Sequence, residues 1–416
     1  MRALIVSPVF PPEPIVSAQT SAQVAAALVA SEHEVTVITA FPSRPAGKLY
    51  PGYRQTLYRQ ERSAAGYNIV RCFSTVSAES RMLSRFAENL SFGLTSGWQV
   101  LWQKRPDVIY ANTWPIFAAG ILALIARWRH VPLVISVQDV YPESLIAQGR
   151  LSPSSRLTAL LRKIDRAIAH SSHKVIVISE RFAQIYLGDR QVPAQKIHVV
   201  PNWVDEQQIV PDKGGAELRS EMGISDSAFL LVYGGNIGAA AKAEGIIEAL
   251  GRLSGREQPH LLIAGSGPNL SACQSLATII APGRVSFYTP WPAEKTSPVY
   301  AAADVLVLPT QGEQSLVSVP SKLIGYMLSA RPIIAQAVSG SDLATVIREA
   351  GCGWVVAPDQ PDRLAQAFRE AMNLPAADLR RLGQLGREYA LHHFTRATCL
   401  PRIIAILEES ARSNGQ

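Results

Sequence analysis

Apolar and often β-branched runs alternate with helical patterns along the whole chain. Within a run, successive positions are apolar rather than every second one, which is typical of parallel strands covered by helices on both faces. The pattern therefore predicts an α/β protein. In the first half we expect strands at Ala3–Ser7, Glu34–Thr39, Asn68–Phe73, Asp107–Ala111, Pro132–Val137 and Lys174–Ser179, and helices near 18–31, 81–104, 115–129 and 155–170.

The second half repeats this alternation. Its strands are expected at Phe229–Tyr233, His260–Ala264, Val285–Tyr288, Asp304–Leu308, Pro332–Gln336 and Trp354–Ala357, and its helices near 241–254, 268–281, 320–329, 341–349 and 360–373. Prolines, glycines and mixed charges in 201–215 predict an interdomain linker. The last stretch, 376–412, predicts two helices with a break near His392–Thr395.

Length, charge and cysteine usage narrow the class of protein. A chain of 416 residues suits two domains of about 200 residues each. The four cysteines are widely separated, which indicates a reducing compartment. MRALIVSPVF has the pattern of a first strand rather than a signal peptide, and the longest apolar run, Trp114–Ala126, is too short for a membrane span.

The net charge of +7 is unevenly distributed. Residues 1–200 carry a net charge of +10, whereas 201–416 carry −3. Basic and aromatic residues alternate in 44–62, and more basic residues lie between Arg150 and Arg166. Most charge runs are solvated faces, but this excess favours an anionic membrane surface or a pyrophosphate-linked acceptor as the partner of the first half.

Ligands of open parallel sheets bind beyond the carboxyl ends of the strands. Two glycine turns follow strands there and lead into helices: Gly234-Gly235-Asn236-Ile237-Gly238, with Lys242 shortly after, and Gly265-Ser266-Gly267-Pro268. Either turn alone is usually a tight corner, but two in one domain indicate a phosphate-bearing ligand that Lys242 can neutralise.

Three further loops carry candidate chemistry. Ser318, Ser321 and Lys322 gather at the start of a helix, where they could bind an anion or simply cap the helix. The first loop, Pro8–Ser17, carries Glu13 and is either a ligand contact or a proline-stiffened connection.

The segment Gln138-Asp139-Val140-Tyr141-Pro142-Glu143-Ser144 places two carboxylates and an amide after a strand. A carboxylate there could orient an acceptor hydroxyl or take its proton. The alternative for Asp139 or Glu143 is capping of the next helix, which we favour for Glu143.

These motifs resemble the retaining glycosyltransferases of family 4, and among them the WbuB-like and WcaI-like enzymes of bacterial surface-polysaccharide synthesis. The resemblance spans nearly the whole chain. It is carried by FPPEP (10–14), HEVTVIT (33–39), QDVYPES (138–144), VPNWVD (200–205), YGGNIG (233–238), IAGSGP (263–268) and VPSKLIGYMLSARPIIA (319–335).

The resemblance implies the GT-B fold, with two Rossmann-like parallel-sheet domains facing across a cleft. Residues 1–200 would form the acceptor domain and 201–390 the donor domain, and a helix in 391–416 would pack back on the first domain. The enzyme would move a sugar, with retention, from a nucleotide-diphosphate sugar to a polyprenyl-diphosphate-linked or other glycan acceptor. It would be cytoplasmic and peripheral on the inner face of the membrane, with no nucleic-acid partner, metal or other cofactor.

The resemblance also implies roles for single residues. Gly234, Gly235 and Asn236 would lie under the donor diphosphate, with Lys242 and Lys322 neutralising it. The backbone near Tyr288–Trp291 would border the base, with Trp291 among the donor-binding residues, and Asp139 with Gln138 would stand near the sugar and the acceptor. The remaining candidates are Glu143 for catalysis and Gly265, Gly267, Ser318 and Ser321 for donor binding.

The chain departs from the family pattern at several positions. Two glutamates eight positions apart are replaced by Val317 and Gly325, a histidine before Asp139 is Gln138, and a Gly-Gly pair in the first loop is absent. These changes leave ribose recognition and sugar identity open. A nucleotide-sugar 2-epimerase of the same fold and a catalytically silent partner in a polysaccharide assembly complex are the alternative functions.

Overall fold

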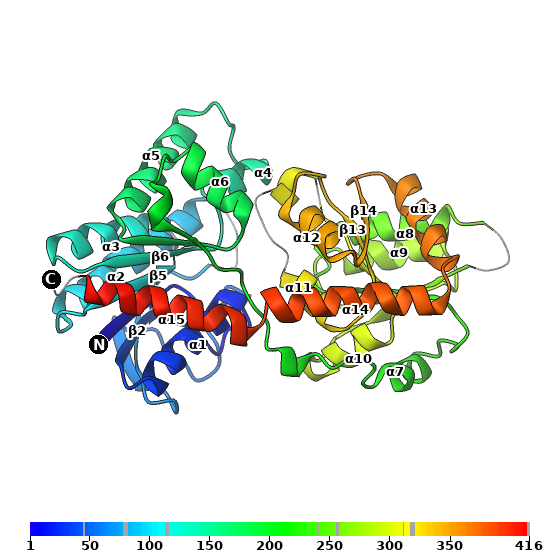
Figure 1. The fold of residues 1–416 in the computed structure, drawn as a ribbon, viewed down its shortest axis with the longest axis horizontal. Helices are drawn as coiled ribbons and strands as arrows, with labels where there is room; N and C mark the ends of the chain where they lie inside the picture. The colour runs from blue at the N-terminus through cyan, green and yellow to red at the C-terminus, as the bar shows by residue number, and fades with distance from the viewer. Residues whose placement is uncertain are drawn as a thin grey trace. The chain divides into compact units, whose positions relative to one another are not determined.

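The computed structural model describes residues 1–44, 46–77, 82–112, 116–238, 241–254, 258–310, 312–316 and 321–413. The chain forms two compact units: unit 1 comprises Met1–Asn202 and Ala397–Gln416, and unit 2 comprises Trp203–Arg396 (Figure 1). Trp203 and Ile209 are buried, and Ile209 belongs to a core cluster of unit 2. Most of the segment expected to be a linker is therefore part of unit 2.

Within the described residues, unit 1 has an eight-stranded sheet in the order β3-β4-β2-β1-β5-β6-β7-β8. Neighbouring strands are parallel except for the antiparallel pair β3–β4. The strands are β1 (Arg2–Ser7), β2 (Glu34–Ala40), β3 (Tyr58–Arg62), β4 (Asn68–Cys72), β5 (Val108–Asn112), β6 (Leu133–Val137), β7 (Lys174–Val177) and β8 (Ile197–Val199). The expected parallel sheet is thus confirmed apart from the polar edge strand β3, whose YRQER sequence has no apolar run.

The helices of unit 1 include one from the far end of the chain. They are α1 (Val16–Ala30), α2 (Met82–Trp102), α3 (Ile116–Trp128), α4 (Glu143–Ala147), α5 (Arg156–Ser171), α6 (Glu180–Gly188) and α15 (Arg396–Arg412). Helix α15 is held to unit 1 by an ion pair of 3.1 Å between Glu409 and Lys174, and by a 2.6 Å hydrogen bond from Arg402 to the Val199 carbonyl. The C-terminal helix therefore packs on the first unit.

Unit 2 has a six-stranded, fully parallel sheet among its described residues, in the order β11-β10-β9-β12-β13-β14. Its strands are β9 (Leu230–Gly234), β10 (His260–Ala264), β11 (Val285–Tyr288), β12 (Val305–Leu308), β13 (Ile333–Gln336) and β14 (Gly353–Val356). Its helices are α7 (Gly215–Glu221), α8 (Ala243–Gly251), α9 (Leu270–Ile280), α10 (Thr296–Ala301), α11 (Ser321–Leu328), α12 (Asp342–Ala350), α13 (Pro361–Met372) and α14 (Ala376–His393).

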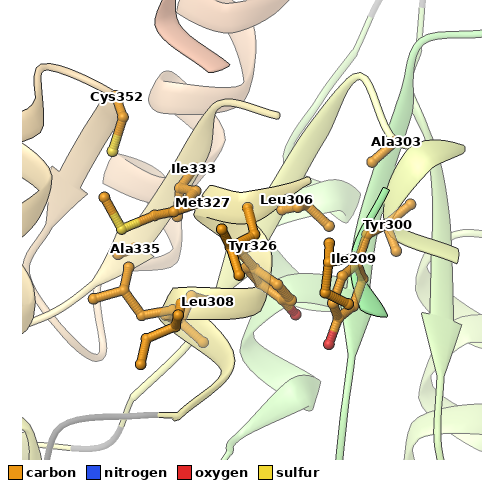
Figure 2. Close-up of a cluster of buried hydrophobic side chains, with 14 of the residues drawn as sticks. Ile209, Tyr300, Ala303, Leu306, Leu308, Tyr326, Met327, Ile333, Ala335 and Cys352 are labelled. Atoms are coloured by element: carbon orange, nitrogen blue, oxygen red, sulfur yellow. The ribbon is translucent and has the colours of Figure 1, made fainter. Parts of the chain in front are cut away.

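A buried apolar cluster supports one face of the unit 2 sheet. Figure 2 shows Leu306 and Leu308 of β12 beside Ile333 and Ala335 of β13, together with tyrosines from α10 and α11. Burial of such apolar side chains stabilises a domain by about 25 cal/mol per Å² removed from water. The cluster thereby fixes helix α11, whose first turn carries Lys322, against the sheet.

Candidate functional site

The loop after β9 is held by a tyrosine of helix α11. The hydroxyl group of Tyr326 accepts a 2.9 Å hydrogen bond from the Gly234 N–H and donates one of 3.2 Å to the Gly234 carbonyl. Tyr326 is fully buried, and its ring packs edge to face on Tyr300 at 4.9 Å between centroids (Figure 2). The backbone entering the first glycine turn is therefore rigidly positioned.

Lys322 lies directly on this turn. A Cβ on Gly235 would overlap Lys322 Cε and stand 2.7 Å from its Nζ, so the lysine occupies the space of the missing side chain. Lys322 Nζ is also 3.2 Å from the Tyr233 hydroxyl and 5.2 Å from the centre of that ring. Among the described residues no carboxylate lies within ion-pairing distance of Lys322. Burial lowers the pKa of this ammonium group, because no neighbouring charge compensates its desolvation.

The two predicted glycine turns are adjacent. Gly235 N–H donates to the Ala264 carbonyl at 2.8 Å, and Ile237 N–H donates to the Ser266 carbonyl at 2.9 Å. Cβ atoms on Gly265 and Gly267 would overlap the carbonyl oxygens of Gly235 and Ile237, respectively. The close packing of the two loops is thus sufficient to explain why glycine occupies both positions. Contact of these glycines with a donor stays a prediction.

Asn236 closes the first turn through its backbone, because its carbonyl accepts a 2.7 Å hydrogen bond from the Tyr233 hydroxyl. Its side-chain amide lies between the neighbouring glycines, close to the positions that Cβ atoms on Gly238 and Gly267 would take. In the described structure, Asn236 therefore shapes the loop.

Lys242 is engaged elsewhere. It precedes α8 with a left-handed backbone (φ 42°), and its ammonium group pairs with Asp359. An open pocket surrounds this pair and is lined by Glu244, Glu248, Asn269 and Gln336, among others. The structure therefore pairs Lys242 with a carboxylate, whereas Lys322 has no such partner among the described residues, and the contact of Lys242 with a donor stays a prediction.

An aromatic wall borders the turn. The Trp291 ring packs edge to face on Tyr300 at 5.9 Å, and both rings would crowd a Cβ on Gly234. The Trp291 indole N–H is buried, and in the described part of the chain it has no hydrogen-bond partner. Gly325, which replaces one family glutamate, faces Tyr300: a Cβ there would stand 3.2 Å from the tyrosine ring. The ring lies against the position from which the carboxylate would extend.

The remaining donor candidates are only partly described. Ser321 is the first residue of α11. Ser318 and the replacement Val317 lie outside the described residues.

Asp139 follows β6 at the carboxyl edge of the unit 1 sheet and is half-buried. The described residues provide it with no hydrogen bond or ion pair. Burial alone raises the pKa of its carboxyl group to about 6. Neighbouring Gln138 is fixed, because its amide donates to Ser136 Oγ at 3.0 Å and accepts from Asn202 Nδ2 at 2.9 Å. An unpartnered carboxyl group with a raised pKa at a strand end is suited to proton transfer or to binding a hydroxyl group.

Glu143 has a different environment. Its carboxylate pairs with Arg190 at 2.6 Å and with Arg162 at 3.0 Å. Burial would raise the pKa of Glu143, but the hydrogen bond and charge of Arg190 outweigh it and hold the pKa below its usual value. Arg190 is itself buried and also binds Asp165 at 2.8 Å and the Tyr141 carbonyl at 2.7 Å. These contacts give Glu143 a positioning role, so its selection as a catalytic residue is not supported.

Glu13 organises the first loop. Its buried carboxylate accepts hydrogen bonds from the N–H groups of Phe10, Ser43 and Arg44 at 2.8–3.1 Å. Because backbone donors already satisfy both oxygens, Glu13 is a loop-closing residue.

Sequence reasoning missed the residues that support these sites. Arg190 and Tyr300 stand far along the chain from the loops they hold, and no local pattern identifies them. Tyr326 lies within the VPSKLIGYMLSARPIIA motif, which did not reveal its role of holding Gly234. Asn202 was indicated by the VPNWVD motif, although without its role of orienting Gln138.

The chain folds into two α/β units, each built on a largely parallel sheet, which is the arrangement expected of the GT-B glycosyltransferases. Residues 17–203 match the family described as glycosyl transferase 4-like domain, and residues 228–373 match glycosyl transferases group 1. The chain therefore belongs to the family 4 glycosyltransferases of GT-B fold.

Individual relatives agree with this assignment. The chain is similar to the colanic acid biosynthesis glycosyl transferase WcaI of Escherichia coli (strain K12), with 26% identity over 87% of this chain and 89% of the relative. The fold is similar to that of sucrose-phosphate synthase from Thermosynechococcus elongatus (TM-score 0.76, 18% identity, 98% of both chains). It is also similar to Anabaena HepE in complex with UDP-glucose (TM-score 0.68, 14% identity, 98% of this chain and all of that one).

Proposed function

We propose that this glycosyltransferase transfers a sugar, with retention, from a nucleoside diphosphate to a lipid-linked glycan in cell-surface polysaccharide synthesis. The observation that carries the proposal is the uncompensated ammonium group of Lys322 against the glycine turn after β9. A half-buried cation beside accessible backbone is a site for a diphosphate. The proposed pathway is supported by the similarity to WcaI, which is named for colanic acid biosynthesis. The proposed donor class is supported by HepE, which was solved with UDP-glucose.

The chemistry requires no nucleophilic side chain. The acceptor oxygen bonds to the anomeric carbon as the bond from that carbon to the diphosphate breaks, and the acceptor proton passes to the leaving diphosphate. Lys322 would stabilise the charge that develops on that diphosphate. Asp139 would hold the acceptor hydroxyl in position.

The proposal assigns no metal to the site, since lysine supplies the neutralising charge. Transfer measured in the presence of a chelator should equal transfer without it. A loss of activity that magnesium or manganese restores would contradict this part of the proposal.

The proposal also places the enzyme on the inner face of the cytoplasmic membrane. No helix in the described ranges is both long and apolar enough to span a bilayer. Exposed Lys48, Arg54 and Arg62, in the basic segment 44–62, would attract anionic headgroups by about 1 kcal/mol each. Vesicle binding through these residues alone should be lost as salt rises.

The decisive experiment incubates the purified protein with a panel of nucleotide sugars and a membrane extract containing lipid-linked glycans. Transfer of labelled sugar with retained configuration supports the proposal. Release of an epimerised nucleotide sugar would assign the 2-epimerase function instead. Nucleotide binding without turnover of any donor would assign the silent binding partner, which the replacement of a family glutamate by Gly325 allows.

A further inference from the structure

Helices α2 and α3 of unit 1 expose an apolar face to solvent. Leu94, Trp98 and Trp102 of α2 are 57–71% exposed, and Leu124 and Trp128 of α3 are 71% and 73% exposed. Soluble proteins rarely expose several large apolar side chains on contiguous elements unless the surface binds something. This group of five residues is called the aromatic face below.

Helical spacing aligns the exposed apolar side chains along each helix. Leu94, Trp98 and Trp102 are four residues apart and share one side of α2, and Leu124 and Trp128 do the same on α3. The Trp98 and Trp102 rings are in contact, with 5.5 Å between their centroids.

The two helices are tightly joined (Figure 1). Cβ atoms on Gly93 and Gly97 of α2 would each come within 3.0 Å of α3, at Ala118 and Ile121, so the missing side chains allow the close approach. Near the other end of the face, Phe86 of α2 packs edge to face on Phe117 of α3 at 5.1 Å.

Charge indicates what covers the aromatic face. Lys104, Arg105 and Arg127 are exposed at the carboxyl ends of the two helices. Within α2 and α3 the only carboxylate is Glu88, which is neutralised by Arg44 at 2.7 Å and Arg85 at 2.8 Å. Asp107, in the segment after α2, accepts a 2.6 Å hydrogen bond from the Arg2 N–H, and the three cations outnumber it. A second copy of the chain would bring like charges together, whereas an anionic lipid surface complements them.

We propose that the aromatic face is a monotopic membrane-docking surface on which α2 and α3 lie flat at the headgroup level of an anionic bilayer. Tryptophan is enriched at that level because its ring is apolar and its N–H is polar. The partner is a lipid bilayer, and insertion of apolar rings adds to the electrostatic attraction of basic residues. This inference extends the proposed function by assigning the surface that reaches a lipid-linked acceptor, although docking itself requires neither donor nor acceptor.

The test is cosedimentation of the full-length protein with phosphatidylcholine vesicles containing phosphatidylglycerol, without any sugar donor. We expect wild-type protein to bind and to remain partly bound at about 1 M salt, where the Debye length is about 3 Å. The triple variant Trp98→Gln/Trp102→Gln/Trp128→Gln should bind about tenfold more weakly and lose the salt-resistant part. Because its substituted side chains are exposed, it should keep its melting temperature, and the single variant Trp128→Gln provides a milder change.

The matched control is Ile279→Gln on α9 of unit 2, which removes an apolar side chain that is 79% exposed. It should bind vesicles like the wild type. Equal binding by the triple variant, an equal loss in the control, or no binding by wild-type protein would overturn the proposal. A wild-type dimer that the triple substitution converts to a monomer would assign the face to a second copy. Since no donor is present, none of these outcomes depends on the transferase activity.

Discussion

The side chain of Lys322 fills the space that a Cβ would take on Gly235. The two residues lie in separate elements far apart in the sequence, yet helix α11 and the turn after β9 bring the ammonium group of Lys322 into contact with the backbone of Gly235. The relationship explains why this turn requires glycine: φ is +155°, and any side chain would displace the lysine.

Replacement of the lysine tests the diphosphate site directly. Lys322→Ala should weaken binding of a nucleoside diphosphate by about 1.5–3 kcal/mol, the range for a charge-assisted hydrogen bond. Calorimetric titration measures the change. Lys295→Ala is the control, because Lys295 is a partly exposed lysine of the same unit that pairs with Glu221 at 2.9 Å. If Lys322→Ala bound the nucleoside diphosphate as tightly as the wild type, the diphosphate site would not lie at the glycine turn after β9.

The effects of substituting Gly235 and Lys322 on nucleotide binding should depend on each other. Gly235→Ala should weaken nucleotide binding about as much as Lys322→Ala, because the new methyl group expels the lysine side chain. In the double variant, the second substitution should reduce the binding free energy by less than it does alone, because the effects of substituting residues in contact do not add. Gly245→Ala on α8, where a Cβ meets open space, should bind like the wild type. Full additivity would show that the two residues act separately.

The raised pKa of Asp139 predicts that both turnover and stability depend on pH. Asp139→Asn should reduce turnover strongly while nucleotide binding persists, and wild-type turnover should rise with pH through about 6 as the carboxyl group ionises. The stability effect has the opposite sign. A folded pKa above the unfolded value of about 3.9 makes unfolding easier as pH rises from about 4 to 6, by at most about 3 kcal/mol.

The asparagine variant should lack that decline, so urea unfolding at several pH values distinguishes the two proteins. If turnover is unchanged in Asp139→Asn, the aspartate has no part in the reaction. If the stability curves of the two proteins coincide, its carboxyl group is not desolvated.

The buried network around Arg190 should dominate the stability of unit 1. Arg190→Met leaves Asp165 and Glu143 without their shared partner and should cost about 3–5 kcal/mol of unfolding free energy. Arg252→Met, which breaks an exposed pair with Asp362, should cost no more than about 1 kcal/mol. Denaturant unfolding provides both values, and equal losses would contradict the assignment.

The contribution of Glu143 to the free energy of unfolding should be lost in acid. Its folded pKa lies below the usual value, so its stabilisation is present above the unfolded pKa of about 4.3 and is lost as pH falls below it. Glu143→Gln should therefore be less stable than wild type at pH 7, and the difference should shrink as the medium is acidified. A constant difference would show that packing rather than charge is responsible.

The sequence by itself determined the repeating α/β pattern and most long elements, because consecutive apolar positions and helical spacing are local signals. The GT-B class was predicted from the resemblance of its motifs to the family 4 glycosyltransferases. It missed β8, whose three residues are too few to show a period, and it also missed helix α6. It also missed β3, whose exposed edge position requires no apolar run.

Only the tertiary structure decided which candidates share a site. Lys242 and Lys322 were both expected to neutralise a diphosphate. In the structure Asp359 pairs with Lys242 across 117 residues, whereas no carboxylate of the described residues pairs with Lys322, which contacts Gly235 and Tyr233. Asp139 and Glu143 were two carboxylates of one sequence motif. Of these two, Arg190 pairs with Glu143, which lies 47 positions before it in the sequence. Charge state and availability depend on contacts between distant segments, and these form only when the strands and helices pack.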